Sequence, residues 1–242
     1  MIQILIKEIN SFLNSLIAYI IIAVFLTGIG LLMWVFPETS VLDYGFADMS
    51  SFFSLCPYIF MFLIPAITMR MFAEEKRGGT MELLLTRPIR DIDIILGKYL
   101  AGVFLVAFSI LPTLLYYFTI SYLGSPVGNI DTAGVFGSYF GLFLLGAAFT
   151  SIGIFSSSFT ENQVTAFVIA VFLCFFLYFG FNAISGLGIF IRYADVIDQI
   201  GILYHHNSMS KGLIDTRDLI YFFSIISAML LFTNLILRSR KW

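Results

Sequence analysis

The dominant pattern along the chain is a series of long apolar runs separated by short polar stretches. Six runs contain no Asp, Glu, Lys or Arg: 15–36, 51–69, 99–123, 133–158, 164–187 and 219–237. A helix needs about 20 apolar residues to cross a bilayer, and each run meets or nearly meets that length. Lipid also requires a backbone that bonds internally, and these continuous runs lack the alternation of barrel strands. The pattern predicts an all-α integral membrane protein with six transmembrane helices.

Residues 1–14, ahead of the first run, have a different pattern. At 100° per residue, one arc is apolar and consists of Ile2, Leu5, Ile6, Ile9, Phe12, Leu13 and Leu16. The opposite arc is polar and consists of Gln3, Lys7, Asn10, Ser11 and Asn14, with Ile4 as the one misfit. Such a pattern is typical of a helix that lies among lipid headgroups, although a cytosolic extension of the first transmembrane helix is an alternative.

The most charged stretch lies between the second and third runs, in a loop that covers 74–97. Its sequence begins Glu-Glu-Lys-Arg-Gly-Gly-Thr at residue 74. Lys76 and Arg77 are expected in the last turn of a helix that Gly78 caps, because cations are favoured at the negative end of a helix dipole. Asp91 and Asp93 are expected to open the next helix, because acids are favoured at its positive end.

A short helix over 81–86 is predicted inside this loop. Thr80 is a suitable N-cap, and Pro88 ends the helix. Three apolar side chains are expected to be exposed on it: Met81, Leu84 and Leu85. Such a face could lie on lipid headgroups or anchor in the groove of a protein partner, and the residues alone leave both interpretations open.

Composition and charge agree with a membrane location. The chain is 60% hydrophobic and only 12% charged, with a mean hydropathy of +0.97, whereas about a quarter of residues are charged in soluble domains. With the N-terminus in the cytosol, ten basic residues lie inside: Lys7, Arg70, Lys76, Arg77, Arg87, Arg90, Lys98, Arg238, Arg240 and Lys241. Only Arg192, Lys211 and Arg217 then lie outside. The positive-inside rule therefore predicts that both termini are cytosolic.

The loop 188–218 before the sixth run mixes apolar and charged residues. This composition predicts an external segment with one or two short helices that re-enter the outer leaflet. His205 and His206 lie in it, and we interpret them as loop residues and not as metal ligands. In the fourth run, Gly137, Gly141 and Gly146 are expected to permit close helix packing.

The sequence offers no chemistry of its own. It has no Walker A phosphate loop and no HExxH zinc motif, and its two cysteines, Cys56 and Cys174, lie in apolar runs where they act as small hydrophobic residues. Ion-coupled carriers need ionisable side chains inside the membrane, and the six runs have none; Asn182 is the most polar deep residue of the fifth run. We therefore predict no catalytic residue and no metal site, and an energy source in a separate ATPase.

The segment from Glu74 to Pro88 resembles the signature of ABC-2 type permeases, which runs close to E-E-K-R-x-G-T-x-E-L-L-L-T-x-P. The stretch from Tyr204 to Asp218 and the basic tail 238–242 are similar to the gliding-motility-associated permease subunit (GldF type). The resemblance covers the whole chain as a single domain, 1–242. Permeases of copper-enzyme maturation complexes share much of the pattern.

This resemblance implies a coupling element that docks into a cytosolic ATP-binding subunit, which would hold the ATP and magnesium. The implied contact residues are Glu74, Glu75, Lys76, Arg77, Thr80, Met81, Glu82, Leu84, Leu85 and Pro88. It also implies a second permease copy or a related permease, and a bacterial inner-membrane location. Two other classes remain open: a membrane scaffold that moves no substrate, and an autonomous channel or carrier.

Overall fold

The computed structural model describes residues 1–43, 45–81, 90–187 and 192–239. Within these ranges the chain is helical and has no strand. Six helical segments are long and apolar enough to cross a membrane: Leu16–Trp34, Ser50–Arg77, Asp91–Leu123, Thr132–Phe159, Gln163–Ser185 and Thr216–Arg238. The prediction of six membrane-spanning helices is confirmed.

Several of these segments consist of more than one helix. The second combines α3 (Ser50–Thr68) with α4 (Arg70–Arg77), and the third combines α6 (Asp91–Ile110), a 3₁₀ turn η1 and α7 (Leu114–Leu123). Pro112 lies in η1, where the missing proline N–H interrupts regular α-helix. The fifth runs from α9 (Gln163–Phe175) through a π-helical turn η2 into α10 (Phe181–Ser185). The first is α2 (Leu16–Trp34).

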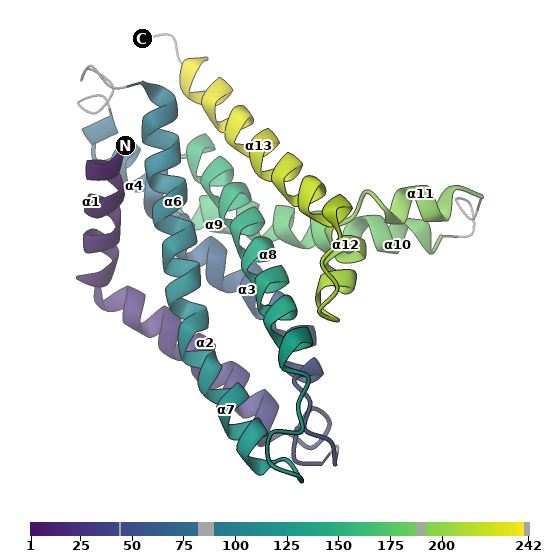
Figure 1. Cartoon of the computed structure of the whole chain (residues 1–242). Helices are drawn as coiled ribbons and strands as arrows, with labels where there is room; N and C mark the ends of the chain where they lie inside the picture. Colours follow the sequence, from purple (N-terminus) through teal and green to yellow (C-terminus); the bar gives the residue numbers. More distant parts are fainter. Residues whose placement is uncertain (44, 82–89, 188–191, 240–242) are drawn as a thin grey trace.

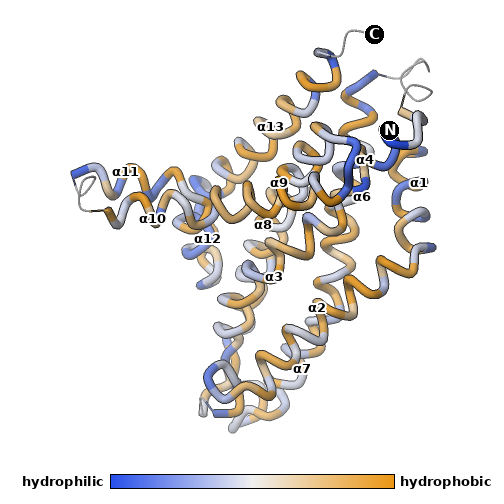
Figure 2. Tube along the Cα trace, turned by 180° about the vertical axis from the view of Figure 1, so that it is seen from behind, coloured by the Kyte–Doolittle hydropathy of each residue, from blue (hydrophilic) through white to orange (hydrophobic). Residues whose placement is uncertain are grey.

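Helix α8 (Thr132–Phe159) lies at the centre of the bundle, where it contacts α3, α6, α9 and α13 (Thr216–Arg238). Its apolar span is 83% buried, whereas the spans of α2, α9 and α13 are each 22% buried. Glycines permit the close contacts of α8, because a Cβ on Gly146 would lie 2.6 Å from Val106 Cγ1. The outer helices are hydrophobic along most of their length (Figure 2) and suit contact with lipid.

Both chain termini lie at one end of the bundle, together with α4 and the start of α6 (Figure 1). We call this the termini end. The α2–α3 and α7–α8 loops lie at the opposite end, which we call the far end. Asp91 and Asp93 occupy the first turn of α6, as the sequence predicts.

The N-terminal helix α1 (Ile2–Leu13) lies beside α6 (Figure 1). The one misfit of its amphipathic pattern, Ile4, is buried, and a Cβ on Gly97 would lie 3.1 Å from it. Ile2 and Ile6, from the predicted apolar arc, are exposed instead. The helix therefore has two apolar sides. One side, with Ile4, packs on α6, and the other, with Ile2 and Ile6, is exposed at the surface and suits contact with lipid.

The segment 188–218, which the sequence analysis predicts to be external, contains two short helices, α11 (Ala194–Asp198) and α12 (Ile202–Met209). Helix α11 pairs with α10, and this hairpin projects sideways from the bundle (Figure 1). Helix α12 returns to the bundle and packs on α8 and α13. Two short helices agree with the sequence prediction; residues 188–191 of the predicted segment lie outside the described ranges.

Candidate functional site

Helix α4 (Arg70–Arg77) contains the first residues of the signature segment Glu74–Pro88. One face of this helix points into the bundle and the other points outward. Met71, Phe72 and Ala73 are buried on the inward side. Glu74 and Arg77 lie about one helical turn apart and are exposed on the outward side. Gly78 caps the helix as predicted, and the following glycine, Gly79, takes the left-handed conformation with φ +67° that few other residues adopt.

A cluster of four charged side chains joins α4 to α1 and α6 on the inward face. We call Lys7, Glu8, Glu75 and Lys98 the charge cluster. Lys98 has no exposed surface, and its Nζ lies 2.7 Å from Glu8 Oε1, 2.9 Å from Glu75 Oε2 and 2.6 Å from the Met71 carbonyl oxygen. The contacts with Glu8 and with the Met71 carbonyl are hydrogen bonds, and the contact with Glu75 Oε2 is an ion pair.

The charge cluster is balanced, with two cations and two carboxylates. Lys7 Nζ donates to Glu75 Oε1 at 2.6 Å. Partial burial disfavours the charged form of Lys7, but the Glu75 and Glu8 carboxylates together outweigh this effect, so the pKa of Lys7 is raised. Glu75 Oε2 makes no well-aligned hydrogen bond, and Lys98 neutralises it as a charge. Separation of these helices would leave buried charges without partners, which is costly. The charge cluster therefore holds α1, α4 and α6 together.

A second set of contacts joins α4 to the end of α8. Ser157 Oγ accepts hydrogen bonds from the backbone N–H of Phe72 (3.0 Å) and Ala73 (3.1 Å), and donates to the Met69 carbonyl (2.9 Å). Lys76 Nζ donates to the Ser158 carbonyl. We call these contacts the α4–α8 link. Ser157 thereby supplies acceptors to N–H groups in the first turn of α4, which lack partners within the helix.

An open cavity of about 420 Å³ lies between α1 and α4. Both signs of charge line it, including Lys7, Arg70 and Glu74. The Arg70 guanidinium lies 5.0 Å from the centre of the Phe12 ring and donates to Ser15 Oγ at 3.2 Å. These contacts fix the start of α4 against α1 and α2.

The sequence analysis assigns one role, contact with the ATP-binding subunit, to all ten signature residues. In the structure, the described residues among them have two different environments. Glu74, Arg77 and Thr80 are exposed, whereas Glu75 and Lys76 bind side chains and backbone of this same chain. Glu82, Leu84, Leu85 and Pro88 lie outside the described residues.

Two details of the predicted short helix differ. Met81, predicted to be exposed, is 3% exposed and belongs to the apolar core, because the chain turns back onto the bundle after Gly79. Thr80 is already helical, and its hydroxyl donates to the Glu75 carbonyl at 3.2 Å, so it satisfies the end of α4.

Four important residues escaped the sequence analysis: Glu8, Lys98, Ser157 and Ser158. The sequence analysis names Lys98 only among the basic residues expected on the cytosolic side. A signal was present, because Lys98 lies on the buried helical stripe of Ile94, Ala101 and Leu105. Its partner Glu8 is 90 residues away, and no local pattern reveals such a pair.

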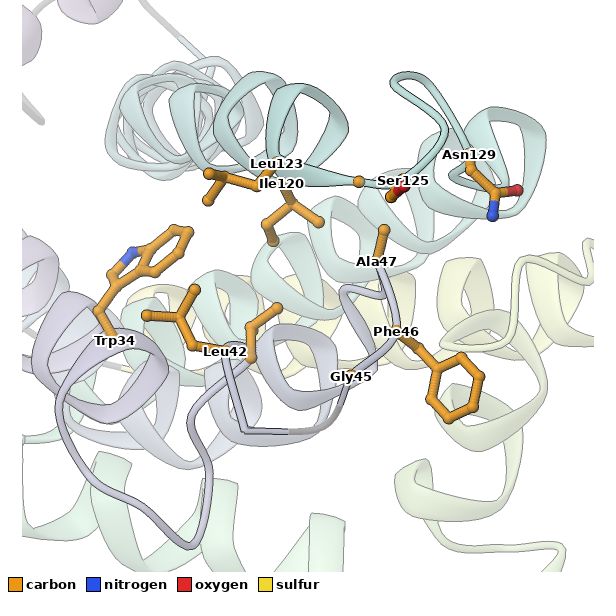
Figure 3. A pocket seen from close by; sticks show the side chains of 11 residues that line it. Trp34, Leu42, Gly45, Phe46, Ala47, Ile120, Leu123, Ser125 and Asn129 are labelled. Carbon is orange, nitrogen blue, oxygen red and sulfur yellow. The ribbon is translucent and has the colours of Figure 1, made fainter.

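A further cavity of about 440 Å³ lies at the far end (Figure 3). It opens between the α2–α3 loop and the end of α7, with Trp34 and Phe46 among its apolar lining residues. Of the described lining residues, Ser125 and Asn129 supply the polar groups apart from backbone and the Trp34 indole. This lining suits contact with apolar groups and contains no acid or base for catalysis.

The two histidines lie on helix α12, not in a loop as interpreted from the sequence. His205 Nδ1 lies 2.7 Å from Asp218 Oδ1 and its Nε2 lies 2.9 Å from the Gln199 carbonyl. His206 is buried, which lowers its pKa to about 4, and its Nδ1 lies 3.4 Å from the Tyr178 hydroxyl. The pair therefore points to different neighbours. The described residues hold no group of three or more metal-ligating side chains.

Comparison with known proteins gives one family. Residues 2–241 match the family described as ABC-2 family transporter protein. A search of curated proteins finds no significant match.

Proposed function

The chain belongs to the ABC-2 transporter family as a membrane permease subunit, and on that premise we propose that α4 is the part on which a separate ATP-binding subunit acts. The outward face of α4, with Glu74, Arg77 and Thr80, would contact that subunit. When that subunit moves α4, the inward face of α4 would pass the movement to the membrane helices.

Two routes lead from α4 into the membrane. The charge cluster binds α4 to α1 and α6 through Glu75 and Lys98. The α4–α8 link binds it to the central helix through Lys76 and Ser157. Close-packed interiors transmit displacement because they deform little. A movement of α4 would therefore shift α1, α6 and α8 together.

The observation that carries this proposal is the division of α4 into an exposed charged face and a face bound to three other segments. A double charge reversal, Glu74→Arg with Arg77→Glu, tests it. We expect the variant to retain its fold, since both side chains are exposed, but to recover less ATP-binding subunit on copurification and to stimulate less ATPase activity. Asp43→Arg at the far end is the matched control. Equal recovery of the ATP-binding subunit with wild type, the double variant and Asp43→Arg would refute the role of α4.

We also propose that the termini end faces the cytosol of a bacterium, with the chain in the inner membrane. Support comes from the basic residues of this end, such as Arg70, Arg90 and Arg238, and from the acidic α2–α3 loop at the far end. Cysteines placed at Arg77 and Asp43 should react with a membrane-impermeant thiol reagent from opposite sides. Labelling of position 77 in intact cells would refute this orientation.

Motility-associated export, in a complex with a second permease copy or a related permease, is the specific role that we propose. It rests on the similarity of Tyr204–Asp218 to the gliding-motility-associated permease subunit. Deletion of the gene should abolish gliding in a gliding host, and reconstituted complex should couple ATP hydrolysis to transport. ATPase activity and gliding without any transport would instead favour a scaffold, and a copper-enzyme defect would favour the maturation complexes.

A further inference from the structure

The open cavity between α1 and α4 lies at the termini end and has a volume of about 420 Å³. This volume is within the range of about 300–1,000 Å³ that is usual for small-molecule sites. Its lining includes three polar or charged side chains from each helix: Lys7, Glu8 and Ser11 from α1, and Arg70, Glu74 and Glu75 from α4. Two helices that are far apart in the sequence therefore form a polar cavity large enough for the headgroup of a lipid.

The cavity lies where two membrane spans end. Helix α2 begins at Leu16, and Ser15 stands just before it. Arg70 is the first charged residue after the apolar run 51–69, and its Nη1 donates to Ser15 Oγ at 3.2 Å. The ends of the two spans thus meet beside the cavity, which places it at the depth of the lipid headgroups. Leu16 and Ile17 are exposed next to Ser15 and offer an apolar surface for acyl chains.

Arg70 and Glu74 have binding capacity that the fold leaves unused. A guanidinium group has five N–H donors, and the structure shows one of those of Arg70 donating, to Ser15. Among the described residues, neither Arg70 nor Glu74 forms an ion pair. The two are four residues apart on α4, a spacing at which Cβ atoms lie about 5–6 Å apart. A cation and a carboxylate without ionic partners therefore border the same cavity, one helical turn from each other.

The charges around the cavity are balanced when the buried lysine of the charge cluster is included. The cations are Lys7, Arg70 and Lys98, and the carboxylates are Glu8, Glu74 and Glu75. Anionic lipids are recognised by clusters of about 4–8 Lys and Arg residues, which this cavity does not have. A balanced lining instead favours a ligand that carries one charge of each sign.

We propose that this cavity binds the headgroup of a zwitterionic phospholipid with a primary amine, phosphatidylethanolamine. The phosphate would accept hydrogen bonds from the Arg70 guanidinium, whose planar donors match phosphate oxygens. The ammonium group would donate to the Glu74 carboxylate. The bound lipid would fasten the start of α4 to the adjoining ends of α1 and α2. This inference concerns the permease and lipid alone and does not rest on the role proposed for α4.

Lipid binding to the delipidated permease, without any ATP-binding subunit, tests the inference. Native mass spectrometry would compare the affinities for phosphatidylethanolamine, phosphatidylcholine and phosphatidylglycerol. We expect one molecule of phosphatidylethanolamine to bind in preference to the other two, because the quaternary amine of phosphatidylcholine has no N–H to donate and phosphatidylglycerol has no cation. Equal affinity for the three lipids would overturn the inference, and so would a preference for phosphatidylglycerol.

Two variants locate the bound lipid. Arg70→Gln should weaken phosphatidylethanolamine binding about tenfold, since it removes a charge-assisted hydrogen bond. Glu74→Gln should weaken it about two- to fivefold, as for exposed ion pairs, and should leave phosphatidylglycerol binding unchanged. Arg90→Gln, at another exposed cation of the termini end, is the matched control and should change neither.

The Glu74 variant keeps the test decisive. Glu74 is exposed, so its replacement should retain the fold even if loss of the contact between Arg70 and Ser15 destabilises the chain. Unchanged phosphatidylethanolamine binding by Glu74→Gln would refute the site, and equal weakening by Arg90→Gln would do the same. Because the ATP-binding subunit is absent, these results are independent of the copurification experiment on α4.

Discussion

Replacement of Lys98 by Met is the most direct perturbation of the charge cluster. The methionine side chain keeps nearly the volume of the lysine stem, so the cavity contribution is small. The change removes the only cation of the cluster that has no exposed surface, and it leaves the Glu8 and Glu75 side chains, 13% and 12% exposed, with Lys7 alone. The Met71 carbonyl also loses its donor.

Removal of one partner from a buried ion pair costs about 3–5 kcal/mol. Lys7 remains 2.6 Å from Glu75 and compensates in part, so we expect a loss at the lower end, about 3 kcal/mol. Equilibrium unfolding in a lipid or detergent environment measures this loss. Limited proteolysis should in addition cut near α1 sooner, because Glu8 no longer ties that helix to α6.

A balanced variant separates charge from packing. Glu8→Gln added to Lys98→Met restores equal numbers of cations and carboxylates, with Lys7 and Glu75 still paired. We expect the double variant to regain at least half of the lost stability, since no carboxylate is then left without a cation. A single variant as stable as wild type, or a double variant less stable than the single, would refute the reasoning.

Two further predictions concern packing and pH. Gly137→Ala should destabilise the bundle by about 1–3 kcal/mol because the new Cβ would lie 2.6 Å from the Gly212 carbonyl oxygen, whereas Gly28→Ala, with nothing within 4 Å, should not; equal unfolding curves would contradict this packing. His206 has an ordinary pKa of 6.5 and a folded pKa of about 4, so the unfolded chain binds its proton first as the pH falls. Stability present above pH 6.5 is therefore lost progressively towards pH 4, by about 2 kcal/mol from pH 7 to pH 5. His206→Gln should lose this part of the acid sensitivity, and an unchanged pH profile would refute the assignment.

The features that the sequence predicted well are local. The six long apolar runs fix the transmembrane helices by length and composition, and Gly78 and Asp91 mark helix ends through short-range capping and dipole effects. The two short helices between the fifth and sixth membrane-spanning segments follow from the mixed composition of that stretch. Each of these inferences needs only neighbouring residues.

The features that escaped prediction depend on tertiary contacts. Ile4 broke the helical pattern because it packs on Gly97 of a distant helix. Glu75 and Lys76 belong to the signature by sequence, yet their side chains bind Lys98 and Ser158, and this inward direction depends on which face of α4 meets the bundle. Met81 is buried for the same reason.

The charge cluster, with its buried Lys98, and the exposed outward face of α4 should respond differently to ionic strength. Mobile ions screen exposed charges such as Glu74 and Arg77 within about 10 Å at 0.1 M, but they have little access to Lys98, which water does not reach. A high-salt wash should therefore release the ATP-binding subunit from the membrane, while the ion pairs of the charge cluster in the permease remain intact. A preparation washed in this way would remain competent to accept fresh subunit after dilution.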